Sequence, residues 1–279
     1  MTMTMNNRKL KQTAAIAAAA AIALPIYVTA PGKATKRQKA PFMGRNFAHR
    51  GLHSRDKSVP ENSIEAFRLA AEMGYGVELD VQLSKDGQVV VFHDDTLDRV
   101  CGVHANVCDL DYSELKTLSL CGTQYGIPLF TEVLDVINGR GPIICELKTG
   151  KRNRELCEKT YEIISNYKGD ICIESFNPMI VFWFRVHAKD LVRGQLSGPT
   201  KSFKGGNSLS TAILLSQLGL NFLGRPQFIA YKLDRKTLPV RFNYALGCMR
   251  VCWTSHEPRN EKGQDAVIFE FYKPKQFFK

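Results

Sequence analysis

Two carboxylates project side by side from one short stretch of the chain. Residues 77–83 alternate between apolar and polar types, so Glu78 and Asp80 fall on one face of a predicted strand. Taken alone, this polar face also fits ordinary solvent exposure. A third carboxylate, Glu146, lies near the end of the apolar run 142–147, where a charge is costly unless it is paired or bound to a metal. Three carboxylates without a thiolate suit one hard divalent cation, Mg²⁺ or Ca²⁺, and disfavour zinc.

Two histidines are placed to work beside these carboxylates. His49 and Arg50 end the first predicted strand of the body, where barrel enzymes carry active-site residues. Asp86-Gly87 indicates a two-residue hairpin turn, and that register places Asp80 opposite His93. Two imidazoles, one neutral and one protonated near pH 7, suit general acid and base catalysis of phosphodiester cleavage. A guanidinium suits bidentate contact with a phosphate.

The elements that position these residues alternate along the chain. The candidate strands are 46–48, 77–83, 89–92, 142–147, 170–174, 192–196, 227–231, 249–253 and 266–269. Helix-like patterns lie between most of them, and a capping-box signature over residues 62–65 begins the first helix. This alternation indicates an α/β fold, either a TIM (β/α)8 barrel or a doubly wound sheet. The chain has no glycine-rich nucleotide-binding loop, which disfavours the doubly wound sheet.

Extra Gly, Asp and Cys residues over about 94–128 indicate a small inserted subdomain.

The N-terminal residues differ from the rest of the chain. Residues 1–40 hold seven basic side chains and no acidic one, out of a net charge of +11. Residues 13–30 are uncharged and apolar, and about 20 such residues span a bilayer as a helix. We therefore expect a basic tail over 1–12, a single-pass membrane anchor over 13–30 and a basic linker over 31–44. A secretory signal cleaved after Ala30, which would release a secreted protein, is the alternative.

Composition limits the class of protein and the kind of partner that the chain can have. Hydrophobic residues at 44% and charged residues at 23% are typical of a folded globular chain. Outside the N-terminal segment the charge is nearly balanced, and no arginine-rich stripe is interleaved with aromatics, so we expect no nucleic-acid partner. Several of the eight cysteines lie inside apolar runs, which predicts buried free thiols.

The ordered motifs of the chain resemble those of the glycerophosphodiester phosphodiesterase family. The matching segments are Phe47-Ala-His-Arg-Gly51, Pro60-Glu-Asn62, Glu78-Leu-Asp80, Lys85-Asp-Gly87, Val90-Val-Phe-His-Asp94 with Leu97 and Arg99, Glu146-Leu-Lys148, and Ser175-Phe-Asn-Pro178. The match covers roughly residues 45–272 and leaves 273–279 as a C-terminal tail.

This resemblance implies a TIM barrel with a small inserted domain. It implies a divalent cation held by Glu78, Asp80 and Glu146, with His49 and His93 as acid and base. The implied reaction hydrolyses a glycerophosphodiester, a small-molecule substrate, to sn-glycerol 3-phosphate and an alcohol such as choline or ethanolamine.

Four further positions bear on the substrate. Arg50 and Lys148 match phosphate-contacting positions of the family, and Glu61 matches a polar residue that lines the site. Trp253 either lines the pocket beside the leaving group or is an ordinary core aromatic. The chain departs from the family pattern at two C-terminal segments, Ser255-His256-Glu257-Pro258 and Ile268-Phe269-Glu270.

The residues described above are compatible with three functions. The leading interpretation is a membrane-tethered glycerophosphodiesterase. An alternative within the same chemistry is a lysophospholipase D-like or polyglycerol-phosphate hydrolase, which a wide apolar groove near Trp253 would favour. The third is a catalytically silent barrel that binds anionic lipid or polymer through its basic linker. The presence of both histidines and all three carboxylates argues against the silent barrel.

Overall fold

Eight parallel strands close into a barrel. The computed structural model describes residues 2–205 and 207–279. The barrel closes because β1 (Arg45–Ala48) pairs with both β2 (Gly76–Leu83) and β9 (Ala266–Phe269). The strands between β2 and β9 are β4 (Ile143–Leu147), β5 (Ile171–Ser175), β6 (Arg193–Ser197), β7 (Phe228–Lys232) and β8 (Met249–Ser255). A further strand, β3 (Val89–Val91), pairs antiparallel with β2. The predicted TIM barrel is confirmed, and each predicted strand lies within two residues of the observed one.

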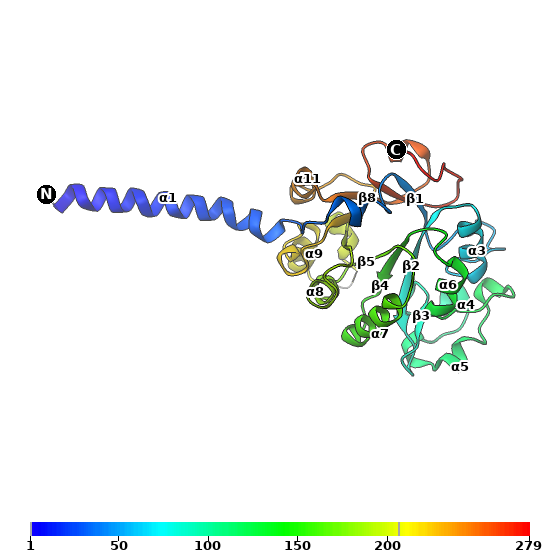
Figure 1. Ribbon diagram of the computed structural model, residues 1–279. Helices are drawn as coiled ribbons and strands as arrows, with labels where there is room; N and C mark the ends of the chain where they lie inside the picture. The colour runs from blue at the N-terminus through cyan, green and yellow to red at the C-terminus, as the bar shows by residue number, and fades with distance from the viewer. Residues whose placement is uncertain (1, 206) are drawn as a thin grey trace.

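Helices cover the outside of the barrel (Figure 1). They are α3 (Ile64–Glu72), α6 (Phe130–Ile137), α7 (Asn153–Ser165), α8 (Pro178–His187), α9 (Leu209–Ser216), α10 (Asn221–Gly224) and α11 (Leu238–Ala245). The cap of α3 lies one residue later than the sequence indicates. Ser63 accepts the hydrogen bond of the Ala66 amide, whereas Asn62 takes a left-handed conformation and turns its amide group toward Asp80.

The barrel interior is apolar at the N-terminal end of the strands. Phe47 of β1 stacks on Phe42 with ring centroids 6.4 Å apart, and Phe228 of β7 belongs to the same cluster. Gly194 leaves space for the Phe228 ring, because a Cβ atom there would lie 2.1 Å from it. All eight cysteines are free and five are buried, as the apolar runs around them predict.

The segment 94–128 lies between β3 and α6 and builds a small core of its own. It contains α4 (Asp98–Cys101), α5 (Tyr112–Leu115) and two short 3-10 turns, η1 (Val107–Asp109) and η2 (Leu120–Gly122). Val90 and Phe92 of the β2–β3 hairpin join this cluster. The segment is therefore attached to the barrel at the strand end that also carries His93.

The β2–β3 hairpin differs from the predicted register by one residue. Its loop has three residues, 85–87, and Gly87 takes a φ of +80°. Asp80 therefore lies opposite Phe92, whose amide donates to the Asp80 carbonyl, and not opposite His93. The predicted pairing was wrong because the turn is one residue longer than Asp86-Gly87 alone suggests.

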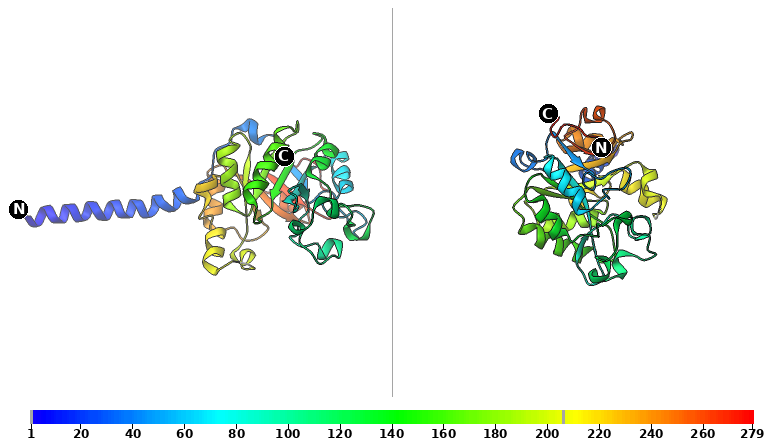
Figure 2. Two further views of the ribbon diagram at one scale, coloured as in Figure 1. Left: turned by 90° about the horizontal axis from the view of Figure 1, so that it is seen from below. Right: turned by 90° about the vertical axis from the view of Figure 1, so that its right-hand side faces the viewer.

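A long helix projects away from the barrel (Figure 1). This helix, α1 (Thr2–Thr29), contains the stretch Lys11–Thr29, which is long and apolar enough to cross a membrane and has a mean hydropathy of 1.6. The side-chain amides of Asn221 and Asn243 both donate to the Thr29 carbonyl, so the end of α1 is fixed to the barrel. The left view of Figure 2 shows the same extended arrangement.

The linker before β1 and the C-terminal residues of the chain both contact the N-terminal face of the barrel. The linker contains α2 (Lys36–Lys39), and the Lys39 ammonium donates to the Gly247 carbonyl just before β8. The last residues return to this face, where the Phe278 amide donates to the Gly44 carbonyl. The N-terminal face is thus covered, and the C-terminal strand ends are left for a site.

Substituting Gly194→Ala tests the packing inside the barrel. We expect a loss of about 1–3 kcal/mol in the free energy of unfolding, because the added methyl group overlaps the Phe228 ring. The measurement is thermal unfolding of the purified full chain. Gly150→Ala is the control, since a Cβ atom there meets no atom within 4 Å. Equal midpoints for the two variants would contradict this packing.

Candidate active site

Three carboxylates meet at the C-terminal end of the barrel. β2 and β4 are neighbours, and Asp80 pairs with Glu146 in the sheet register. Glu78 lies two residues before Asp80 and shares its face, so one oxygen from each of the three lies within 4.8 Å of the others. All three side chains are buried. Burial, together with the charges of Asp80 and Glu146, raises the pKa of Glu78 well above its ordinary value.

This cluster has the chemistry of a hard-cation site. Its donors are carboxylate oxygens only, and Asp80 Oδ1 is buried without a hydrogen-bond partner. Burial and mutual repulsion disfavour the ionised form of Glu78, and a divalent cation would stabilise that form. Mg²⁺ and Ca²⁺ accept this donor set and complete their coordination with water or substrate oxygen. The residues present therefore fit the cation that the sequence predicts.

Two basic side chains lie against the carboxylates. Lys148 Nζ is 3.0 Å from Glu146 Oε1 and 3.4 Å from Asp80 Oδ1, and Arg50 Nε is 3.5 Å from Asp80 Oδ2. Burial alone would raise the pKa of Asp80, but the charges of Lys148, His93 and Arg50 lower it. Burial likewise opposes the charge of Lys148, and Glu146 and Asp80 raise its pKa. Fixed positive charges here suit an anionic group such as a phosphate.

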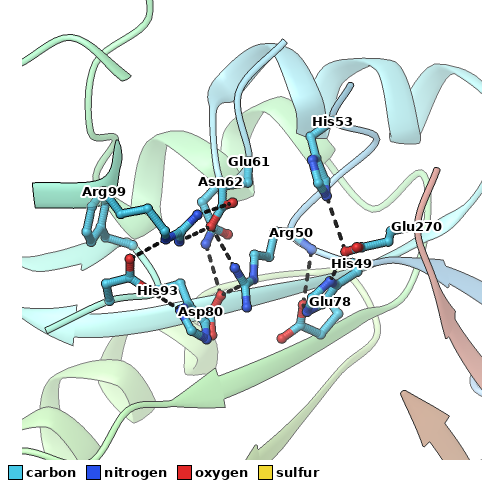
Figure 3. A network of polar contacts seen from close by, with 12 residues as sticks. His49, Arg50, His53, Glu61, Asn62, Glu78, Asp80, His93, Arg99 and Glu270 are labelled. Carbon is cyan, nitrogen blue, oxygen red and sulfur yellow. Dashed lines mark hydrogen bonds and ion pairs between the residues drawn. The ribbon is translucent and has the colours of Figure 1, made fainter. Parts of the chain in front are cut away.

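A carboxylate orients His49 at the end of β1. His49 Nδ1 lies 2.6 Å from Glu270 Oε2, and His49 Nε2 lies 4.0 Å from Glu78 Oε2. Figure 3 shows Glu270 between His49 and His53, whose Nε2 is 3.6 Å from the same oxygen. Burial lowers the pKa of His49, and the hydrogen bond to Glu270 opposes this shift. The imidazole thus turns Nε2 toward the carboxylate cluster.

A chain of ion pairs links His93 to Arg50. His93 Nδ1 lies 2.6 Å from Asp94 Oδ1, and Arg99 Nε lies 2.5 Å from Asp94 Oδ2. Arg99 pairs with Glu61 at 2.7 Å, and Glu61 pairs with Arg50 at 2.7 Å (Figure 3). Burial opposes the charge of Glu61, but hydrogen bonds and charges from Arg99 and Arg50 lower its pKa to about 2. Glu61 therefore stays ionised and joins the two guanidinium groups.

Both histidines adjoin the carboxylate cluster despite the shifted hairpin register. Figure 3 places His93 beside Asp80 and His49 beside Glu78. The charge of His93 is one of those that lower the pKa of Asp80. The two imidazoles are thus held by separate carboxylate partners: His49, after β1, by Glu270, and His93, after β3, by Asp94.

Trp253 belongs to an aromatic wall beside an apolar groove. Its Nε1 donates to the Ala230 carbonyl at 3.0 Å, and its ring meets Phe176 edge-on at 5.7 Å. Phe176 in turn meets Phe203 at 5.9 Å. The groove beside Phe176 has a volume of about 540 Å³, and its apolar lining is Phe176, Pro178, Met179, Phe203, Leu215 and Leu220. Trp253 both packs on the barrel core and supports this wall.

Sequence reasoning missed three polar side chains of the site. Glu270 orients His49, and the Asn62 amide donates to Asp80 Oδ2 at 2.9 Å. Glu174 is buried next to Glu146 in the sheet register, and its Oε2 has no hydrogen-bond partner. Burial, reinforced by nearby carboxylates, raises the pKa of Glu174. The sequence did offer a signal for two of them, because Glu174 ends the predicted strand 170–174 and Glu270 directly follows the predicted strand 266–269.

The chain is similar to known phosphodiesterases. The glycerophosphoryl diester phosphodiesterase family model matches residues 49–266. A glycerophosphodiester phosphodiesterase of Caldanaerobacter subterraneus subsp. tengcongensis is 39% identical over 142 residues, which are 47% of this chain and 57% of that protein. Lysophospholipase D GDPD1 of Rattus norvegicus is 36% identical over 152 residues, which are 50% of this chain and 46% of that protein. The chain spans about half the length of these curated relatives.

Solved structures share the fold over most of the barrel. A glycerophosphodiester phosphodiesterase of Thermotoga maritima is 28% identical with a TM-score of 0.60, over 80% of this chain and 93% of that one. A phosphodiesterase of Oleispira antarctica, solved with its product sn-glycerol-3-phosphate, is 23% identical with a TM-score of 0.66, over 83% of this chain and 94% of that one. With the family match covering most of its length, the chain belongs to the glycerophosphoryl diester phosphodiesterase family.

Proposed function

We propose that this protein hydrolyses glycerophosphodiesters to sn-glycerol 3-phosphate and an alcohol. The observation that carries the proposal is the meeting of three buried carboxylates with Arg50 and Lys148 at one end of the barrel. His49 and His93 adjoin the same cluster, each with a carboxylate on its Nδ1 atom. The family relatives named glycerophosphodiester phosphodiesterase support the same reaction.

The histidines are the acid and the base of the proposed reaction. A carboxylate on Nδ1 holds the proton at that atom and leaves Nε2 to exchange a proton with the substrate. His49 and His93 both have this arrangement, through Glu270 and Asp94 respectively. One imidazole takes the proton of the attacking hydroxyl or water, and the other gives a proton to the leaving alcohol oxygen as its bond to phosphorus breaks.

Charged side chains bind the phosphodiester and stabilise its transition state. Arg50 and Lys148 approach the phosphoryl oxygens, where negative charge grows during the reaction. Glu61 keeps the Arg50 guanidinium in place through their 2.7 Å ion pair. A divalent cation held by Glu78, Asp80 and Glu146 would supply Lewis-acid polarisation of the phosphate.

We further propose that α1 anchors the barrel to a membrane as a single-pass helix. The Arg225 guanidinium donates to the carbonyls of Tyr27 and Ala30 and lies 4.5 Å from the Tyr27 ring centroid. Cleavage after Ala30 would remove Tyr27 and the Thr29 carbonyl that Asn221 and Asn243 bind. These contacts favour a retained anchor over a cleaved signal.

Removal of divalent cations tests the proposed metal site. We expect EDTA to abolish release of glycerol 3-phosphate from glycerophosphocholine by the full chain, and Mg²⁺ or Ca²⁺ to restore it. Glu78→Gln should lower kcat at least about 100-fold, because it removes a charged ligand. Glu72→Gln, on the exposed face of α3, is the matched control. Full activity in EDTA would contradict a metal requirement.

Replacing each histidine tests the acid and base roles. His49→Asn and His93→Asn should each lower kcat by about 100-fold to 10,000-fold, since each removes one proton-transfer group. His104→Asn should leave kcat unchanged, because His104 is exposed on the inserted segment. The measurement is steady-state hydrolysis of glycerophosphocholine with saturating metal. Wild-type turnover in either of the first two variants would remove that histidine from the mechanism.

The apolar groove favours a second candidate, lysophospholipase D-like hydrolysis. An acyl chain of a lysophospholipid would fit against Phe176, Met179 and Phe203. Met179→Asp should then raise KM for lysophosphatidylcholine about tenfold or more and leave glycerophosphocholine hydrolysis unchanged. Val186→Asp, also exposed on α8 but outside the groove, is the control. Equal kinetics of both variants on both substrates would reject a lipid chain in this groove.

A further inference from the structure

Exposed apolar side chains lie on α9, on α11 and on the residue that caps α11, outside the active site. We call this surface the α9–α11 face, and its members are Leu209, Ile213, Leu214, Leu238 and Leu246. Each is more than two fifths exposed, and Leu238 reaches 78%. The Thr237 hydroxyl, at the start of α11, donates to the Ser216 carbonyl at the end of α9, which joins the two helices. A group of exposed aliphatic side chains is more typical of a binding surface than of a surface open to water.

The same part of the chain is strongly basic. Residues 199–247 carry seven basic side chains and one acidic side chain. The inserted segment 94–128 has the opposite balance, with six acidic and two basic side chains. Figure 1 shows α4 and α5 of that segment at the end of the molecule away from α1. The barrel is therefore polarised, and an anionic surface would attract its α9–α11 end and repel the insertion.

The α9–α11 face is continuous with the apolar helix. α1 leaves the barrel beside α9 and α11 in both Figure 1 and Figure 2. Asn243 of α11 binds the last carbonyl of α1, at Thr29. The Tyr27 ring lies under the Arg225 guanidinium, a pair of residue types that is typical of a membrane–water interface. A membrane crossed by α1 therefore begins next to this face.

We propose that the α9–α11 face rests on the anionic head groups of the membrane that carries α1. Its leucine and isoleucine side chains enter the interface, and the basic side chains around them pair with lipid phosphates. The inference rests on the proposed anchoring by α1. Leu215 of α9 lines the apolar groove, so this docking also places the groove beside the lipid surface.

Tryptophan reporters in the full chain test this docking. Ile213→Trp probes the α9–α11 face, Lys116→Trp probes the inserted segment, and Tyr27→Trp probes the anchor. Each variant is reconstituted in phosphatidylcholine vesicles with 30% phosphatidylglycerol, with and without brominated acyl chains that quench nearby indoles. The native Trp183 and Trp253 give the same background in all three variants.

We expect bromolipid to quench the added emission of Ile213→Trp and of Tyr27→Trp at least twofold, and to leave that of Lys116→Trp unchanged. Adding Lys201→Glu, Lys204→Glu and Arg241→Glu to Ile213→Trp should abolish its quenching, because the charge that attracts anionic lipid is reversed. Hydrolysis of glycerophosphocholine checks that each variant is folded.

Two outcomes would overturn the docking in distinguishable ways. Quenching of Tyr27→Trp without quenching of Ile213→Trp would mean that α1 is inserted and the barrel stands clear of the lipid. Quenching of neither would mean that α1 does not insert, so the anchoring fails together with the docking. Because hydrolysis of glycerophosphocholine is measured separately, either outcome leaves the proposed reaction standing.

Discussion

Repulsion among carboxylates buried at one end of the barrel is the constraint on which the site depends. Glu78, Asp80 and Glu146 are buried and bring one oxygen each within 4.8 Å of one another. Arg50 and Lys148 offset two of the three negative charges. Burial, together with the remaining repulsion, raises the pKa of Glu78, and a divalent cation or a protonated carboxyl would relieve that repulsion. The carboxylate cluster therefore favours the binding of a cation.

The barrel tolerates this charge because its two ends have different interiors. Phe42, Phe47 and Phe228 pack their apolar rings together at the N-terminal end of the barrel interior. The charged side chains of the site lie at the C-terminal strand ends, where Glu61 and Glu270 hold Arg50 and His49 beside the cluster. Stability and chemistry are thus assigned to opposite ends of one sheet.

Basic and acidic side chains are also distributed unevenly between the two sides of the barrel. The basic stretch 199–247 and the apolar helix α1 lie together, and the acidic segment 94–128 lies at the other end (Figure 1). The apolar groove beside Phe176 lies between α8 and α9, next to the proposed lipid contact. A lipid substrate and a lipid-bound enzyme would then meet on one side, which connects the second candidate activity to the docking.

The sequence by itself determined the strands and the residue types of the cluster. The period-two alternation of residues 77–83 assigns Glu78 and Asp80 to one face whatever the fold, because side chains alternate along any strand. The sequence could not determine the register of the β2–β3 hairpin, since a three-residue loop and a two-residue turn both accommodate Asp86-Gly87. Only the closed barrel brings Glu270 to His49, because contacts between residues 221 positions apart depend on the pairing of β1 with β9.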